Sequence, residues 1–163
     1  IQEFVRLGRK YNKTIMMNPA PFCEMPENIF EGVDYLTPNE TEAAYFSGLD
    51  KVETTDDARK AAQILMGRGA KSVLITLGGK GAFYYDGKVE YTVAPPEAKV
   101  VDTTGAGDAF NGAFATALSE GKDILTAIKF ANCVATISVT RQGTSTSLPT
   151  REEADALFEK AYL

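Results

Sequence analysis

Apolar and polar residues follow two different rhythms along the chain, and together the rhythms predict alternating helices and strands. Helices are predicted where apolar residues recur three and four positions apart or a capping residue opens a polar turn. These segments are residues 1–11, 40–46, 54–67, 110–118, 124–139 and 150–161. Strands are predicted where short apolar runs stop at a turn signal. These are residues 13–17, 33–36 and 72–77, with a hairpin around Asp86-Gly87.

Capping residues indicate where four of these helices begin. Asn39 and Asp123 each precede a predicted helix. Thr54 with Asp57, and Thr150 with Glu153, have the spacing of a capping box. The inner faces are predicted to carry Ala58, Ala61, Ala62 and Leu65 in the one helix, and Ala154, Leu157, Phe158 and Ala161 in the other. The order of elements predicts an α/β fold with a largely parallel sheet.

The length of 163 residues suits one domain, which we expect to span residues 1–163. Residue 1 is Ile rather than Met, and no cap precedes the first helical pattern. We therefore interpret residues 1–11 as a helix shortened by truncation. No repeat or linker interrupts the chain.

Composition narrows the function classes. Apolar residues make up 44% and charged residues 24%, as in soluble globular proteins. The net charge of −5 argues against a general nucleic-acid binder, and no apolar run is long enough to span a membrane. No signal peptide opens the chain, and Cys23 and Cys133 are isolated, which favours a reducing, cytoplasmic location.

The chain contains no histidine, and this changes the candidate chemistry. Catalysis by Ser-His-Asp or Cys-His groups is excluded, as are zinc sites that use histidine. A general base must therefore be a carboxylate or another titrating group.

One stretch, Val101–Phe110, combines the features of an anion site with two acids. Gly105 and Gly107 allow a tight turn directly before a helix, and the first N–H groups of a helix can bind phosphate. Asp102 and Asp108 flank this turn, where one could hold a cation or accept a proton. A plain glycine turn is the alternative. A Walker A loop is absent, and Phe110 replaces the third glycine of a dinucleotide loop.

The sequence Asp-Thr-Thr-Gly-Ala-Gly-Asp-Ala-Phe at 102–110 resembles the C-terminal signature of the ribokinase-type (phosphofructokinase-B) carbohydrate kinases. Segments 18–21, 37–42, 76–81 and 139–143 resemble further family motifs in the same order. The resemblance covers nearly the whole chain. It implies a three-layer α/β/α fold with a largely parallel sheet, of which this chain is the C-terminal half. The N-terminal half and its β-sheet lid have no counterpart here.

The resemblance also implies roles for individual residues. Asp108 would be the general base, and Gly105, Ala106 and Gly107 would form the anion hole. The nucleotide and its Mg²⁺ would be bound by Asn39, Glu42, Thr76, Leu77, Gly78, Gly79, Lys80, Gly81, Gly107, Asp108 and Asn132. A monovalent cation, K⁺, would lie at Asp102, Thr104, Ser138, Arg141, Gly143 and Ser147, partly through backbone carbonyls. If no ligand binds Asn132, its side chain is expected to be a buried polar group that needs a hydrogen-bond partner.

The activity implied is ATP-dependent phosphoryl transfer to a sugar hydroxyl. Within the family, the tail and the segments 18–21 and 38–42 are most similar to those of enzymes that convert D-ribose to D-ribose 5-phosphate. Fructokinase or 2-keto-3-deoxygluconate kinase activity, and a non-catalytic nucleotide-binding fragment, are alternatives. The partners expected are a sugar and ATP, not nucleic acid or a membrane. The chain alone is expected to be inactive or impaired, and dimerisation stays open because the lid is absent.

Overall fold

The computed structural model describes residues 1–21, 24–26 and 28–163, and it divides into two compact units. Unit 1 comprises Ile1–Gly78 and Phe83–Thr92. Unit 2 comprises Gly79–Ala82 and Val93–Leu163. Helices and a mixed sheet together give the predicted α/β class.

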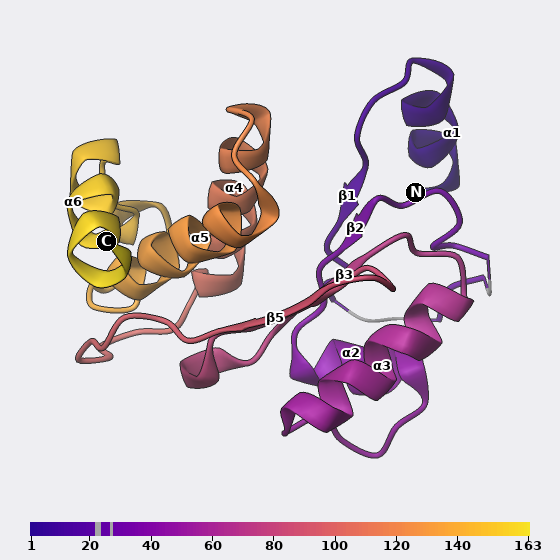
Figure 1. Ribbon diagram of the computed structural model, residues 1–163, viewed down its shortest axis with the longest axis horizontal. Helices are drawn as coiled ribbons and strands as arrows, with labels where there is room; N and C mark the ends of the chain where they lie inside the picture. The colour runs from indigo at the N-terminus through magenta and orange to yellow at the C-terminus, as the bar shows by residue number, and fades with distance from the viewer. Residues whose placement is uncertain (22–23, 27) are drawn as a thin grey trace. The chain divides into compact units, whose positions relative to one another are not determined.

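The sheet has five strands in sequence order (Figure 1). They are β1 (Met16–Met17), β2 (Tyr35–Leu36), β3 (Val73–Thr76), β4 (Ala82–Tyr85) and β5 (Glu90–Val93). The first three are parallel, with Leu36 opposite both Met17 and Val73. The turn between β4 and β5 is closed by Asp86, whose N–H donates to the carbonyl of Val89 over 3.3 Å. So short a connection makes this pair antiparallel, as predicted for the hairpin.

The helices of unit 1 are α1 (Gln2–Lys10), α2 (Glu40–Ser47) and α3 (Thr55–Gly67). The capping box of Thr54 and Asp57 is present, which confirms the predicted start of α3. Helices α2 and α3 pack on each other, and both contact β3. The predicted inner face of α3 is fully buried, as are Val73, Leu74 and Ile75 of β3. Burial of this apolar surface is the main source of stability for unit 1.

The helices of unit 2 are α4 (Ala106–Ser119), α5 (Ile124–Ser138) and α6 (Arg151–Tyr162). Helix α4 packs on α5, and α5 packs on α6. The caps predicted at Asp123 and Thr150 are both present. Arg151 ties the helices together, because it pairs with Glu120 after α4 and lies over the ring of Phe130 in α5.

Several local predictions were inexact. The loop after β3 forms a 3₁₀ turn, η1 (Gly78–Lys80), and a second, η2 (Ser145–Ser147), lies before α6. Ala161 is exposed rather than part of an inner stripe, because only the first part of α6, at Ala154, is buried. Packing decides these details, and packing is not visible in a local pattern.

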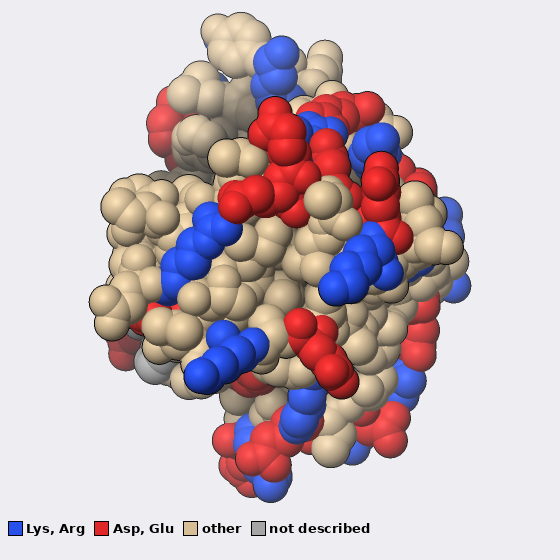
Figure 2. Space-filling view, turned by 90° about the vertical axis from the view of Figure 1, so that its left-hand side faces the viewer, with Lys and Arg blue, Asp and Glu red and all other residues tan. Residues whose placement is uncertain are grey.

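Charged side chains of both signs are interspersed on the face drawn in Figure 2. No helix within the described ranges has the length and apolar character needed to cross a bilayer.

Candidate active site

The start of α4 has backbone donors without partners. Gly105 is its N-cap residue, and no side chain caps the helix. The N–H of Ala106 donates to the carbonyl of Thr103 over 3.2 Å, and that of Ala109 donates to the carbonyl of Gly105 over 2.9 Å. Within the described part of the chain, the N–H groups of Gly107 and Asp108 have no hydrogen-bond acceptor. Such donors at a positive helix end suit an anion.

The conformation of Gly105 explains the first glycine of the motif. Its φ of 77° lies in the left-handed region, which is costly for a residue with a side chain. A Cβ added there would also lie 3.4 Å from Cγ2 of Thr144. The loop at 141–147 therefore packs directly against the turn that opens α4. Gly107, by contrast, is helical, and a Cβ there would meet nothing within 4 Å.

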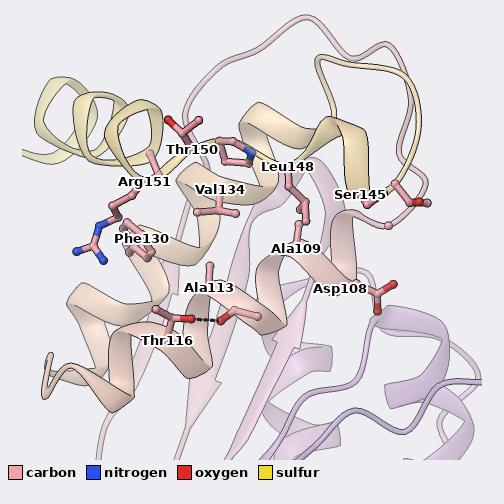
Figure 3. Close-up of a pocket in the computed structure, with 15 residues that line it drawn as sticks. Asp108, Ala109, Ala113, Thr116, Phe130, Val134, Ser145, Leu148, Thr150 and Arg151 are labelled. Atoms are coloured by element: carbon pink, nitrogen blue, oxygen red, sulfur yellow. Dashed lines mark hydrogen bonds between the residues drawn. The ribbon is translucent and has the colours of Figure 1, made fainter.

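Asp108 lies in the first turn of α4 and is exposed. The structure gives its carboxylate no ion pair or hydrogen bond with any described residue. It lines a cavity of about 480 Å³ between α4, α5 and the start of α6. Figure 3 shows Asp108 and Ser145 at one end of this cavity and Arg151 at the other. The carboxylate of Asp108 is therefore accessible from this cavity.

Asp102 joins two loops beside the start of α4. One carboxylate oxygen accepts the N–H of Thr104 over 2.9 Å, and the other accepts the N–H of Gly143 over 3.1 Å. Hydrogen bonds from Thr104, first through its side chain and then its backbone, and from the Gly143 amide hold the pKa of Asp102 below its ordinary value. The carboxylate is therefore ionised at neutral pH.

The residues predicted for K⁺ are all in unit 2, and the structure brings some of them together. Asp102, Thr104 and Gly143 are linked by the hydrogen bonds just described. The hydroxyls of Ser138 and Ser147 instead donate to carbonyls three residues earlier. These two residues could then offer a cation their backbone carbonyls. An ionised carboxylate together with backbone carbonyls is a donor set that fits a hard cation.

Asn39 and Glu42, predicted near the nucleotide phosphates and Mg²⁺, form a capping box at the start of α2. The side chain of Asn39 accepts the N–H of Glu42 over 2.9 Å, and Glu42 Oε2 accepts the N–H of Asn39 over 2.9 Å. Glu42 is only 4% exposed. This arrangement does not fit Glu42 as a direct Mg²⁺ ligand.

The segment 76–81, predicted to line the nucleotide, has a mixed environment. Thr76 forms a parallel bridge with Asn39, and Leu77 is buried. Gly78–Lys80 are exposed in η1. Gly81 has a φ of 91°, and a Cβ there would lie 1.9 Å from the carbonyl oxygen of Val93. The glycine at this position is required by backbone contact.

Asn132 finds its partner inside unit 2. It is buried, and its Nδ2 donates to the carbonyl of Val93 over 3.0 Å. A structural role therefore accounts for this amide without a ligand. The neighbouring Cys133 is also buried, and burial raises the pKa of its thiol to about 12, so it is unreactive at neutral pH. Cys23 lies outside the described residues.

Sequence reasoning missed two contacts near the site. One is the packing of Thr144 on Gly105. The other is a bidentate pair between the guanidinium of Arg141 and the carboxylate of Glu153. Glu153 was recognisable only as the third residue of a capping box, and Arg141 only as a backbone position. Nothing in the local sequence pairs them.

Comparisons with known proteins agree with the motif at the start of α4. The family model described as pfkB family carbohydrate kinase matches residues 2–151. A ribokinase of Haemophilus influenzae is 38% identical over 156 residues, which are 96% of this chain and 51% of that protein. The chain thus spans about half the length of the curated relatives it matches.

Solved structures show the same fold. A ribokinase of Thermotoga maritima, 40% identical, superposes with a TM-score of 0.85 over 96% of this chain and 52% of that one. A ribokinase of Arabidopsis thaliana complexed with ribose and ATP is 30% identical. It superposes with a TM-score of 0.88 over 95% of this chain and 50% of that one. The chain belongs to the pfkB family of carbohydrate kinases.

Proposed function

We propose that this chain supplies the phosphoryl-transfer half of an ATP-dependent sugar kinase that converts D-ribose to D-ribose 5-phosphate. The observation that carries the proposal is the start of α4. There, amide donors without partners and an unpaired carboxylate lie side by side at the mouth of a cavity. This combination suits a reaction in which negative charge develops on a transferred phosphoryl group while a hydroxyl loses a proton.

Two kinds of group in this chain have separate roles in the reaction. The N–H groups from Gly105 to Asp108 stabilise the charge on the phosphoryl oxygens. The carboxylate of Asp108 accepts the proton of the sugar hydroxyl as the new bond forms. When bound, ATP would supply the phosphoryl group, and Mg²⁺ would neutralise part of the phosphate charge.

The remaining predicted residues have supporting parts. Asn39 and Glu42 would act on the metal through water, and the segment 76–81 would contact the nucleotide. Asn132 would support that segment from within, because it binds the Val93 carbonyl that Gly81 also meets. Asp102, Thr104, Ser138, Arg141, Gly143 and Ser147 would hold K⁺ close to the anion hole. Asp102 supports this role because its two hydrogen bonds keep it ionised. A bound cation there would strengthen the pull of the α4 start on a phosphate.

The choice of D-ribose rests on the three relatives described above, which are all named ribokinase and one of which is complexed with ribose and ATP. Fructose and 2-keto-3-deoxygluconate are the alternative acceptors. The test is a panel of these sugars, with and without K⁺, in a fusion. That fusion joins the N-terminal half of the Thermotoga maritima ribokinase to residues 1–163. We expect K⁺-dependent phosphorylation of ribose, and no sugar-dependent turnover by the 163-residue chain alone.

A non-catalytic nucleotide-binding module is the competing function. Asp108→Asn separates the two, because it removes the base and keeps the backbone donors. Loss of turnover with ATP binding retained supports the kinase. Unchanged turnover in the fusion would reject Asp108 as the base.

A further inference from the structure

We propose that the ion pair between Arg141 and Glu153 positions the anion hole of α4 from the first turn of α6. The inference rests on the proposed function, since it concerns the same amide donors. It assigns a role to two side chains that lie outside the motif.

The first step is the attachment of the loop at 141–147 to the start of α4. The amide of Gly143 donates to Asp102 over 3.1 Å, and the other oxygen of Asp102 accepts the amide of Thr104. Thr144 lies against Gly105 at van der Waals distance from the place of a Cβ. Two consecutive loop residues therefore fix the turn that precedes the amides of Gly107 and Asp108.

The second step is the attachment of the same loop to α6. Arg141 begins the loop, and its Nη1 donates to Oε2 of Glu153 over 3.2 Å while its Nη2 donates to Oε1. Bidentate pairs of this kind fix direction as well as distance. The two side chains are 39% and 42% exposed, so the pair is a surface contact of modest strength.

The third step is the rigidity of Glu153 itself. Its Oε2 also accepts the N–H of Thr150 over 2.9 Å, and its own N–H donates to the Thr150 hydroxyl over 3.3 Å. The carboxylate that holds Arg141 is thus part of the capping box of α6. A displacement of α6 would therefore move Glu153 and Arg141. The loop that begins at Arg141 would move with them, and with it the Gly143 amide that binds Asp102. Arg141 and Glu153 are positioning residues, because neither touches a reacting atom.

Single and double variants of the ion pair test this series of contacts. Glu153→Gln removes the charge that Arg141 binds, while a glutamine can still serve the capping box. Arg141→Gln removes the other partner, and the double variant completes a cycle. Arg59→Gln is the matched control, because Arg59 forms the same kind of bidentate pair with Glu90 at similar exposure, but within unit 1.

Two measurements report on the geometry and use of the anion hole rather than on overall stability. Amide chemical shifts of Gly105, Gly107 and Gly143 in the 163-residue chain report its geometry without activity. Turnover and KM in the fusion report its use. We expect both single variants to shift these amides and to lower kcat about two- to fivefold with KM for ribose unchanged. The double variant should equal either single one, and Arg141→Lys should restore part of kcat.

The proposal is overturned if the three amides stay in place in Arg141→Gln and Glu153→Gln. It is also overturned if Arg59→Gln moves them equally, or if the two single effects add. Its failure is distinct from that of the kinase proposal. Asp108→Asn tests the kinase by turnover, and the amide shifts test the ion pair whether or not the fusion is active.

Discussion

Two helices of this protein begin at segments that resemble family motifs, yet their first turns are built in opposite ways. Helix α2 begins with Asn39 and Glu42, whose side chains bind each other's backbone N–H groups. Helix α4 begins with Gly105, which has no side chain to offer, and the amides of Gly107 and Asp108 have no acceptor in the described part of the chain.

The two helix starts suit different purposes. A side-chain cap stabilises a helix by about 1 kcal/mol. Helix α2 has this stabilisation and fixes a buried carboxylate. Helix α4 lacks it and keeps donors available for a ligand.

Asp108→Asn should have the largest effect. In the fusion with the Thermotoga maritima half, we expect kcat to fall about 10²- to 10⁴-fold, because general-base catalysis is removed. ATP affinity, measured by calorimetry, should change little, since the backbone donors are intact. Asp155→Asn, on the exposed side of α6, serves as the charge-matched control and should keep its turnover. Equal losses in the two variants would contradict the assignment of Asp108.

Gly105→Ala should destabilise the α4 start. The left-handed φ of 77° makes a Cβ costly, so the free energy of unfolding in urea should fall by about 1–2 kcal/mol. Gly107→Ala is the control, because Gly107 is helical and a Cβ there meets nothing within 4 Å. The free energy of unfolding of Gly107→Ala should equal that of the parent chain or be slightly higher. A loss as large in Gly107→Ala as in Gly105→Ala would show that backbone conformation does not explain the motif.

Asn39→Ala should affect stability at α2. It deletes one half of the capping box, and we expect a loss of about 1 kcal/mol in urea unfolding. Asn39→Ser keeps an acceptor at the N-cap and should lose much less. If Asn39→Ala were as stable as the parent chain, the capping bonds of α2 would contribute nothing, and the contrast with α4 would disappear.

Low pH should weaken the hydrogen bonds beside the start of α4, with a smaller effect than the substitutions above. The pKa of Asp102 is below its ordinary value, so its contribution to stability is present above about pH 4 and is lost as the pH falls through the folded-state pKa. Amide resonances of Thr104 and Gly143 should therefore shift together below about pH 4, as their acceptor is protonated. In Asp102→Asn, this common shift should be absent. Independent titration of the two amides would contradict a shared acceptor.

The sequence predicted the parts of the fold that depend on neighbours in the chain. The capping box at Thr54, the buried run at Val73 and the turn at Asp86 are local signals, and all three elements are present. The turn before α4 was equally readable, since two glycines beside a helical pattern leave few alternatives.

Contacts between distant segments could not be predicted in this way. Gly81 is required by the carbonyl of Val93, and Asn132 is satisfied by the same carbonyl. The pair of Arg141 and Glu153 depends on how α6 packs after a turn. One domain over residues 1–163 stays a prediction, as do the ligands assigned to individual residues from the family motifs.

The most direct test of the contrast is a titration of the ¹⁵N-labelled 163-residue chain with ATP and Mg²⁺, followed by amide chemical shifts. The account predicts that the amides of Gly107 and Asp108 move most, because their N–H groups gain an acceptor. Those of Asn39 and Glu42 should move less, because they are already bonded within α2. Large shifts at Asn39 and Glu42 with none at Gly107 and Asp108 would contradict the account.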